Sequence, residues 1–396
     1  MNNLATRRPF LTALAISLGA AVSLGMSRFS YALLLPPMRG DLGWTYLLAG
    51  AMNTGNAFGY FIGALMTPAL MRRFGAHRIL VAGALLAALF MLVSGFVTDT
   101  SMLMSQRILS GVASAFTFIS GGVLAARLGG MHPRHAGFLI GLYYGGAGFG
   151  IVLSAWLVPV TLAAAAGFGA AHGWQWAWLV LGGTCLLATL GMTAPARHIP
   201  DAPRQSDAHG RFRIRSFGYG LAAYFMFGAG YIGYMTFVVA LLKQQGMSAP
   251  MITLFYTLLG VAVMASSRIW AGMLDYFKGG QSLAILNGLL ALATLLPALT
   301  AMPLAVFASG ILFGGVFLSV VASTTTLVRH NLPPSAWSAG ISAFTTVFAF
   351  GQIAGPSAVG WIADGAGGLQ RGLVFSALTL CIGALLALRQ RALPLP

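Results

Sequence analysis

Apolar runs long enough to cross a bilayer, about 18 residues or more, recur along the whole chain and constrain its fold more than any other feature. Only 7% of the residues are charged and the mean hydropathy is +0.84, whereas a soluble domain carries about 25% charged residues. Because backbone amides inside lipid must find partners within the protein, such a chain folds into membrane-spanning helices. The sequence therefore predicts an all-α membrane protein.

Twelve transmembrane helices are expected. The predicted spans are 10–37, 46–71, 78–98, 101–126, 135–160, 174–194, 217–242, 249–274, 281–300, 302–328, 336–362 and 370–389. The segment 195–216 is the one long polar stretch, and we interpret it as a cytoplasmic linker. It separates an N-terminal six-helix bundle, 1–194, from a C-terminal six-helix bundle, 217–396.

The distribution of Lys and Arg predicts the orientation. Sixteen of these residues fall on one set of alternate loops, against Arg39, Lys243 and Arg371 on the other. This is the positive-inside pattern, and it predicts a multi-pass inner-membrane protein with both termini in the cytoplasm. The net charge of +16 follows from this topology and gives no reason to expect a nucleic-acid partner.

The two predicted bundles repeat each other in sequence at a constant offset of 203 positions. Among the matches are Gly25 with Gly228, and Tyr31 with Tyr234. Each copy holds an even number of helices, so the repeat is parallel and the bundles are related by a pseudo-two-fold axis along the membrane normal.

The chain resembles transporters of the major facilitator superfamily (MFS) over essentially its full length. The superfamily's fourth-helix motif, Arg-x-x-x-Gly, is present as Arg107 to Gly111. The ungapped run Arg28–Met38, followed by Asp41-Leu42-Gly43-Trp44 and residues 53–60, resembles the YbfB/YjiJ-type subgroup. The resemblance implies the MFS fold, transport of a small-molecule substrate across the lipid membrane, and function as a monomer without a cofactor.

A cytoplasmic loop motif of the superfamily, which couples the bundles, is degenerate in this chain. The resemblance implies conformational gating for the residues at the matching positions, which are Arg72, Arg73, Gly75, Arg78 and, in the second copy, Asp275. Arg72 stands where an acidic residue is usual, whereas Asp275 keeps the acid at the repeat-equivalent position.

Two arginines in predicted spans are the main candidates for substrate binding. Arg28 is expected about 12 Å from the outer end of the first helix and Arg107 about 9 Å from that of the fourth. A guanidinium inside the membrane costs roughly 2.5–3.5 kcal/mol on insertion scales, and it generally faces a cavity, a ligand or a partner. Two such cations favour an organic anion such as a carboxylate, which matches guanidinium geometry bidentately. The alternatives are snorkelling of Arg28 to the interface and a structural or switching role for Arg107.

Tyrosines are expected to complete this site. Tyr31 follows Arg28 by three residues, which places both on one face of an α-helix. The repeat-equivalent positions are Tyr231 and Tyr234 on the seventh helix, so a cationic wall would oppose an aromatic, hydroxyl-bearing wall. Helix packing is the alternative for this pair, and Tyr219 and Tyr224 are assigned to an interfacial aromatic belt.

Further substrate-binding candidates are polar residues within predicted spans: Asn53, Asn56, Tyr143, Tyr256 and Gln352. For Asn53 and Asn56, hydrogen bonding between helices is the alternative.

Neither carboxylates nor histidines are expected in the middle of any span. Coupling through a buried protonatable residue is therefore disfavoured, which leaves uniport, exchange, or symport in which the substrate carries the proton. Efflux of amphipathic compounds is an alternative function. A polytopic enzyme or a sensor is disfavoured because neither catalytic nor metal-binding groupings nor a soluble output domain are visible.

Overall fold

The computed structural model describes residues 8–200 and 213–393, and within these ranges it contains helices and no strands. It forms two compact units. Unit 1 comprises Met1–Trp44, Gly55–Pro203 and Ser248–Met264, and unit 2 comprises Thr45–Thr54, Arg204–Met247 and Ala265–Pro396. Residues 201–212 of the predicted linker lie outside the described residues, and the predicted bundle boundaries stay a prediction.

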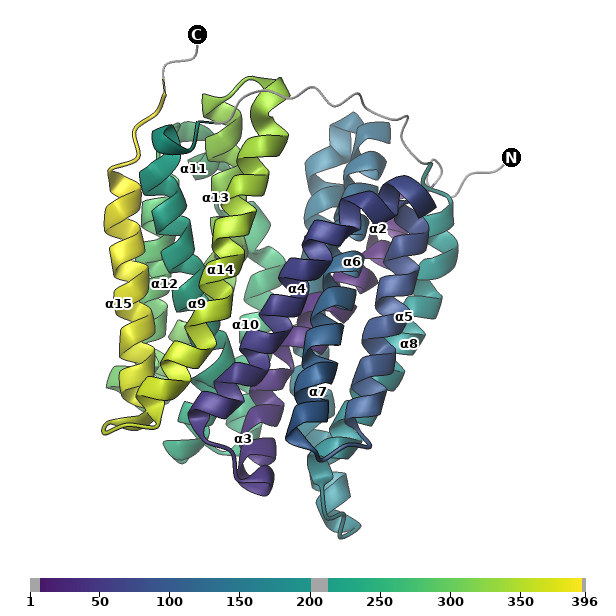
Figure 1. Cartoon of the computed structure of the whole chain (residues 1–396), viewed down its shortest axis with the longest axis vertical. Coiled ribbons are helices and arrows are strands. Elements are labelled where there is room, and N and C mark those ends of the chain that lie inside the picture. Colours follow the sequence, from purple (N-terminus) through teal and green to yellow (C-terminus); the bar gives the residue numbers. More distant parts are fainter. Residues whose placement is uncertain (1–7, 201–212, 394–396) are drawn as a thin grey trace. The chain divides into compact units, whose positions relative to one another are not determined.

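The first half of the chain is a succession of long helices (Figure 1). In chain order these are α2 (Pro9–Ala20), η1 (Ala21–Phe29), α3 (Tyr31–Leu42), α4 (Tyr46–Phe74), α5 (Ala76–Ser94), α6 (Thr100–Met131), η2 (Pro133–His135), α7 (Ala136–Gly167) and α8 (Gly173–Arg197).

The second half repeats this pattern. Its elements are η3 (Ile214–Phe217), α9 (Gly218–Gln244), α10 (Ala249–Ile269), α11 (Ala271–Tyr276), α12 (Gln281–Leu299), α13 (Pro303–Asn331), η4 (Pro334–Ala336), α14 (Trp337–Ala363) and α15 (Gly368–Leu388).

The all-helical fold confirms the prediction, and each predicted span contains a long helix. Ten helical segments of the described chain are long and apolar enough to cross a membrane. α4 and α14 are not among these ten, because buried amides (Asn53, Asn56 and Gln352) lower their mean hydropathy. The predicted span 249–274 is interrupted at Trp270, where α10 gives way to the short α11.

The first predicted span is continuous but not α-helical throughout. α2, η1 and α3 follow one another, and η1 is a π-helical stretch whose turn is wider than that of an α-helix. The Ser30 amide accordingly bonds the Gly25 carbonyl, five residues back, at 3.1 Å. A Cβ built on Gly25 would lie 2.5 Å from the Gly150 Cα of α7, so η1 and α7 approach backbone to backbone.

Within each unit, neighbouring helices bury small and apolar residues. In unit 1, α5 lies against α6 and α8, and α2 lies against α7 and α8; in unit 2, α9 lies against α12, α14 and α15 (Figure 1). Between α4 and α5 the chain turns at Gly75, whose φ of 84° falls in the region that favours glycine.

The described carboxylates lie at or near helix ends. Asp99 caps α6 by accepting the Met102 amide at 2.8 Å, which satisfies one of the orphan donors of that helix. Asp41 accepts bonds from the Trp174 indole at 2.5 Å and from the His172 ring at 2.7 Å. Asp364 accepts the amides of Tyr46 and Leu47 at 2.7 and 2.8 Å, and Asp275 is exposed in α11. None of these four groups lies in the middle of a long helix.

Candidate functional site

Two buried arginines form the centre of the candidate site in unit 1. Arg28 is the penultimate residue of η1 and is 2% exposed, and Arg107 lies in the first third of α6 and is 4% exposed. Arg107 donates to the carbonyl of Ser27, the residue directly before Arg28, and η1 packs against α6. The two arginines therefore lie on neighbouring helices, and their similar depth in the membrane stays a prediction.

The Arg107 guanidinium contacts a backbone carbonyl and two aromatic rings. One terminal nitrogen donates to the carbonyl of Ser27 at 2.9 Å. The guanidinium carbon lies 4.6 Å from the centre of the Tyr31 ring and 5.8 Å from that of Trp178. Cation–π contacts of this kind are stronger when they are desolvated, as they are here.

Arg28 has its own aromatic neighbour. Its guanidinium carbon lies 5.6 Å from the centre of the Tyr60 ring, on α4. The Tyr31 ring stacks on the Arg107 guanidinium. That Tyr31 shares a helix face with Arg28 stays a prediction.

A ladder of small polar groups joins η1 to α6 beside the arginines. The Ser27 hydroxyl lies 2.8 Å from that of Ser110 and 3.1 Å from that of Ser114. The Asn56 amide donates to the Arg107 carbonyl at 3.0 Å. Asn56 therefore makes the interhelical bond that we gave as the alternative to a cavity position. These bonds fix the position of the α6 backbone that carries Arg107.

Two further predicted residues of unit 1 use their hydroxyls to bond the backbone of neighbouring helices. Tyr143, on α7, donates to the Phe118 carbonyl of α6 at 2.7 Å. Tyr256, on α10, donates to the Phe29 carbonyl at 2.7 Å, directly after Arg28. Both side chains are fully buried, so in this conformation they support the helices around the arginines.

In unit 2, Tyr231 and Tyr234 belong to a buried aromatic stack on α9, α13 and α14. Tyr231 stacks on Phe227 at 4.8 Å, and Tyr234 stacks on Phe313 at 4.1 Å, both measured between ring centres. The Tyr234 hydroxyl lies 2.7 Å from that of Ser309. The side chain of Tyr234 therefore packs among α9, α12 and α13, because Ser309 also bonds the Ala293 carbonyl.

The other predicted residues of unit 2 are also buried. Asn53 donates to the Thr236 hydroxyl at 2.6 Å, and Asn53 and Gln352 are each 3% exposed. The interhelical alternative again describes Asn53. The structure thus brings together Arg28, Tyr31, Arg107, Asn56 and Tyr256 around η1 in unit 1. Tyr143 belongs to the same unit, and Asn53, Tyr231, Tyr234 and Gln352 belong to unit 2.

The predicted gating residues lie at helix ends. Arg72 and Arg73 end α4, Gly75 forms the turn, and Arg78 lies in the first turn of α5; the three arginines and Asp275 are exposed. Their gating role stays a prediction.

Sequence reasoning missed several contributors. Trp178 and Tyr60 were not proposed, because a lone aromatic in a span gives no signal of a nearby cation. Tyr224 was assigned to an interfacial belt, and this is wrong: it is 2% exposed and stacks on Phe348 at 4.8 Å. A signal was present, since Tyr224, Phe227 and Tyr231 recur every three or four residues along α9.

The chain is similar to two solved membrane transporters. A bacterial homologue of the human lysosomal transporter Spinster, in an inward-facing and unoccupied conformation, has a TM-score of 0.67 at 14% identity, covering 96% of each chain. The nucleoside transporter NupG has a TM-score of 0.67 at 16% identity over 98% of each chain, and a mutant of it has a TM-score of 0.72. Identities this low establish the fold alone.

The match to a transporter family, together with the fold, defines the class: a membrane transporter of the major facilitator type rather than an enzyme. More particularly, the chain belongs to the family described as "Uncharacterised MFS-type transporter YbfB", whose sequence model matches residues 20–388. The comparison with curated proteins finds no match.

Proposed function

We propose that this transporter carries a small organic anion, such as a carboxylate, and that Arg28 and Arg107 bind its negative charge. The observation that supports this most is the pair of buried arginines on the adjacent elements η1 and α6 of unit 1. Each costs free energy to hold inside a membrane protein, and their mutual repulsion adds to that cost. An anion bound next to both arginines would offset the cost of burying the two cations and their mutual repulsion.

The chemistry of the surroundings supports a carboxylate. A guanidinium presents paired N–H donors that match the two oxygens of a carboxylate. Tyr31, Tyr60 and Trp178 surround the cations with aromatic surface, which suits a ligand whose anionic group is attached to an apolar body.

We also propose the oligomeric state, the membrane orientation and the transport mechanism. The protein works as a monomer in the inner membrane with both termini in the cytoplasm, and transport proceeds by alternating access between bundles 1–194 and 217–396. Substrate contacts on the C-terminal side are assigned to Tyr231, Tyr234 and Gln352. Gating is assigned to the cytoplasmic residues Arg72, Arg73, Gly75, Arg78 and Asp275.

The test is ligand-dependent thermal stabilisation of the purified protein across a panel of organic anions and hydrophobic cations. A ligand that binds only the folded state stabilises it by RT ln(1 + [L]/Kd), about 2.7 kcal/mol at one hundred times Kd. The variants are Arg28→Gln, which removes the charge, and Arg28→Lys, which keeps the charge but lacks the paired N–H donors of a guanidinium. Arg371→Gln is the matched control, because Arg371 is exposed at the start of α15.

We expect a carboxylate to stabilise the wild type and Arg371→Gln, to stabilise Arg28→Lys less, and to leave a folded Arg28→Gln unchanged. Uptake of that carboxylate into proteoliposomes would then follow the same order. Equal stabilisation of all four proteins would contradict the assignment of Arg28.

Efflux of amphipathic compounds is the second candidate, and the aromatic stack of unit 2 favours it. Phe227 and Phe348 stack on each other, and each stacks on both Tyr224 and Tyr231, with ring centres less than 6 Å apart. Such surfaces suit apolar cations as well as aromatic acids. If hydrophobic cations stabilise the wild type and Arg28→Gln alike, efflux replaces anion transport as the leading function.

A further inference from the structure

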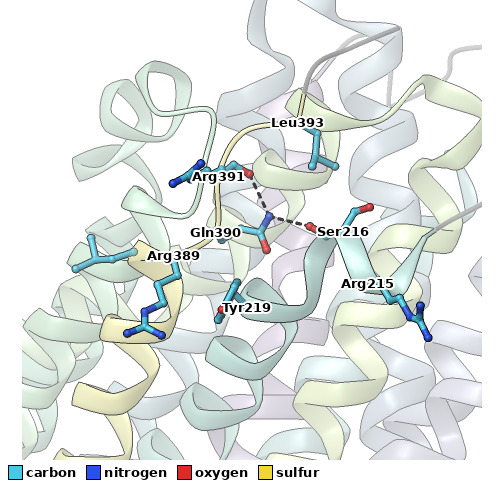
Figure 2. A pocket seen from close by; sticks show the side chains of 8 residues that line it. Arg215, Ser216, Tyr219, Arg389, Gln390, Arg391 and Leu393 are labelled. Carbon is cyan, nitrogen blue, oxygen red and sulfur yellow. Dashed lines mark hydrogen bonds between the residues drawn. The ribbon is translucent and has the colours of Figure 1, made fainter.

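A second cationic site lies far along the chain from Arg28 and Arg107, where α15 ends and α9 begins (Figure 2). A pocket of about 580 Å³ opens there, entirely within unit 2. Its lining includes Arg215, Tyr219, Arg389 and Arg391. Nothing in the proposed transport mechanism uses these residues.

Gln390 lines this pocket and is only 4% exposed. Its amide nitrogen donates to the carbonyls of Ser216 at 3.0 Å and Arg391 at 3.1 Å, and its amide oxygen accepts the Gly220 amide at 3.0 Å. Figure 2 shows the first two bonds. The Gln390 carbonyl also accepts the Gly280 amide at 2.8 Å. The segment that follows α15 is therefore fixed against the start of α9.

The hydrogen bonds of Gln390 determine where the neighbouring arginine side chains lie. Because Gln390 points into the protein, Arg389 and Arg391 on either side of it extend outward, as Figure 2 shows. Arg215 contributes a third exposed guanidinium from η3, across Tyr219 from Arg389. The lining residues include three arginines and no acidic residue, so the pocket attracts anions.

An apolar surface leads along α15 to these arginines. Leu378, Ile382, Leu385 and Leu388 are 57%, 49%, 64% and 60% exposed. Their spacing of three and four residues places them on one face of the helix. In a membrane protein, such a face contacts acyl chains, and Leu388 itself lines the pocket. Tyr219, which is 47% exposed, combines an apolar ring with a polar hydroxyl as residues at the interface do.

We propose that this pocket binds the phosphodiester headgroup of an acidic membrane lipid, with an acyl chain along the exposed face of α15. Guanidinium forks match phosphate oxygens bidentately, and basic pockets between membrane helices on the cytoplasmic side are suited to anionic headgroups. The combination of three cations with an adjoining apolar face distinguishes a lipid from free phosphate, which would use only the cations. This proposal does not depend on the identity of the transported substrate.

Native mass spectrometry of the delipidated full-length protein tests it. The probe is phosphatidylglycerol, with phosphatidylcholine as the zwitterionic lipid and inorganic phosphate as the free anion. The pocket variant is R215Q/R389Q/R391Q. The matched control, R8Q/R134Q/R197Q, removes three exposed arginines of unit 1 and lowers the net charge by the same amount.

We expect phosphatidylglycerol to bind the wild type and the control variant and to bind the pocket variant far more weakly. Each basic residue near an anionic surface contributes on the order of fivefold in affinity, so the loss should reach roughly a hundredfold. Equal losses in both variants would indicate general electrostatic attraction and overturn the site. Displacement of the bound lipid by millimolar inorganic phosphate, or equal binding of phosphatidylcholine, would overturn the assignment to an acidic lipid.

Discussion

The close approach of η1 and α7 predicts the effect of one added methyl group. A Cβ on Gly25 would lie 2.5 Å from the Gly150 Cα and 2.7 Å from the Ala147 carbonyl oxygen. An ordinary contact needs at least 3.4 Å, so Gly25→Ala forces the two backbones apart by about 0.9 Å (3.4 minus 2.5). Both neighbours are backbone atoms, and no side-chain rotation relieves the overlap. Overpacking of this kind costs about 1–3 kcal/mol.

The matched control is Gly183→Ala, in α8, where an added Cβ meets nothing within 4 Å. Both substitutions gain the helix propensity of alanine, about 0.8–1.0 kcal/mol, so the difference between them isolates the overpacking. We expect Gly25→Ala to be about 1–3 kcal/mol less stable than Gly183→Ala in thermal unfolding in detergent. Arg28 lies three residues after Gly25 in η1. We therefore expect the thermal stabilisation by a bound ligand to fall in Gly25→Ala and to be unchanged in Gly183→Ala. Equal unfolding midpoints for the two variants would refute the close approach.

Three further predictions follow from single contacts. Asp99→Ala should lower stability by about 1 kcal/mol through loss of the α6 N-cap, whereas Asp99→Asn, which keeps an acceptor, should not; thermal unfolding distinguishes them. Tyr143→Phe should lower the free energy of unfolding by about 0.5–1.5 kcal/mol, because it loses the bond to the Phe118 carbonyl, and it should leave the transport KM unchanged. A raised KM at unchanged stability would instead assign the Tyr143 hydroxyl to substrate binding. In detergent, a thiol-reactive fluorophore should label the exposed Cys381 in the folded protein but the buried Cys185 only on unfolding, so Cys381→Ser should show no labelling below the unfolding midpoint.

The helices could be predicted from sequence because the bilayer allows few alternatives. A long apolar run in lipid has to be helical, and hydropathy therefore located a helix for every span, although some helices end five to seven residues beyond the predicted bounds, as α7 does at Gly167. Local irregularities were not predictable. Neither the π-helical η1 nor the interruption at Trp270 alters hydropathy. At the interruption the Trp270 indole bonds the Gly315 carbonyl at 2.7 Å, a contact between residues 45 positions apart that hydropathy does not reveal.

The candidate site was predicted in part for the same reason. A charged residue in an apolar run is conspicuous, so Arg28 and Arg107 were identified at once. Their aromatic neighbours were not, because the partner of each cation depends on the turn of η1 and on helices distant in sequence. Tyr31 contacts Arg107, and Tyr60, from α4, contacts Arg28; neither contact could be read from the sequence.

The paired arginines have an electrical consequence. A guanidinium remains protonated at physiological pH, so the empty site carries two fixed positive charges whatever the proton gradient. Moving one elementary charge across 100 mV is worth about 2.3 kcal/mol. A bound monocarboxylate leaves one net charge on the site, and a dicarboxylate leaves none. If the substrate is the organic anion proposed above, its valence sets how strongly membrane voltage acts on the loaded protein relative to the empty one.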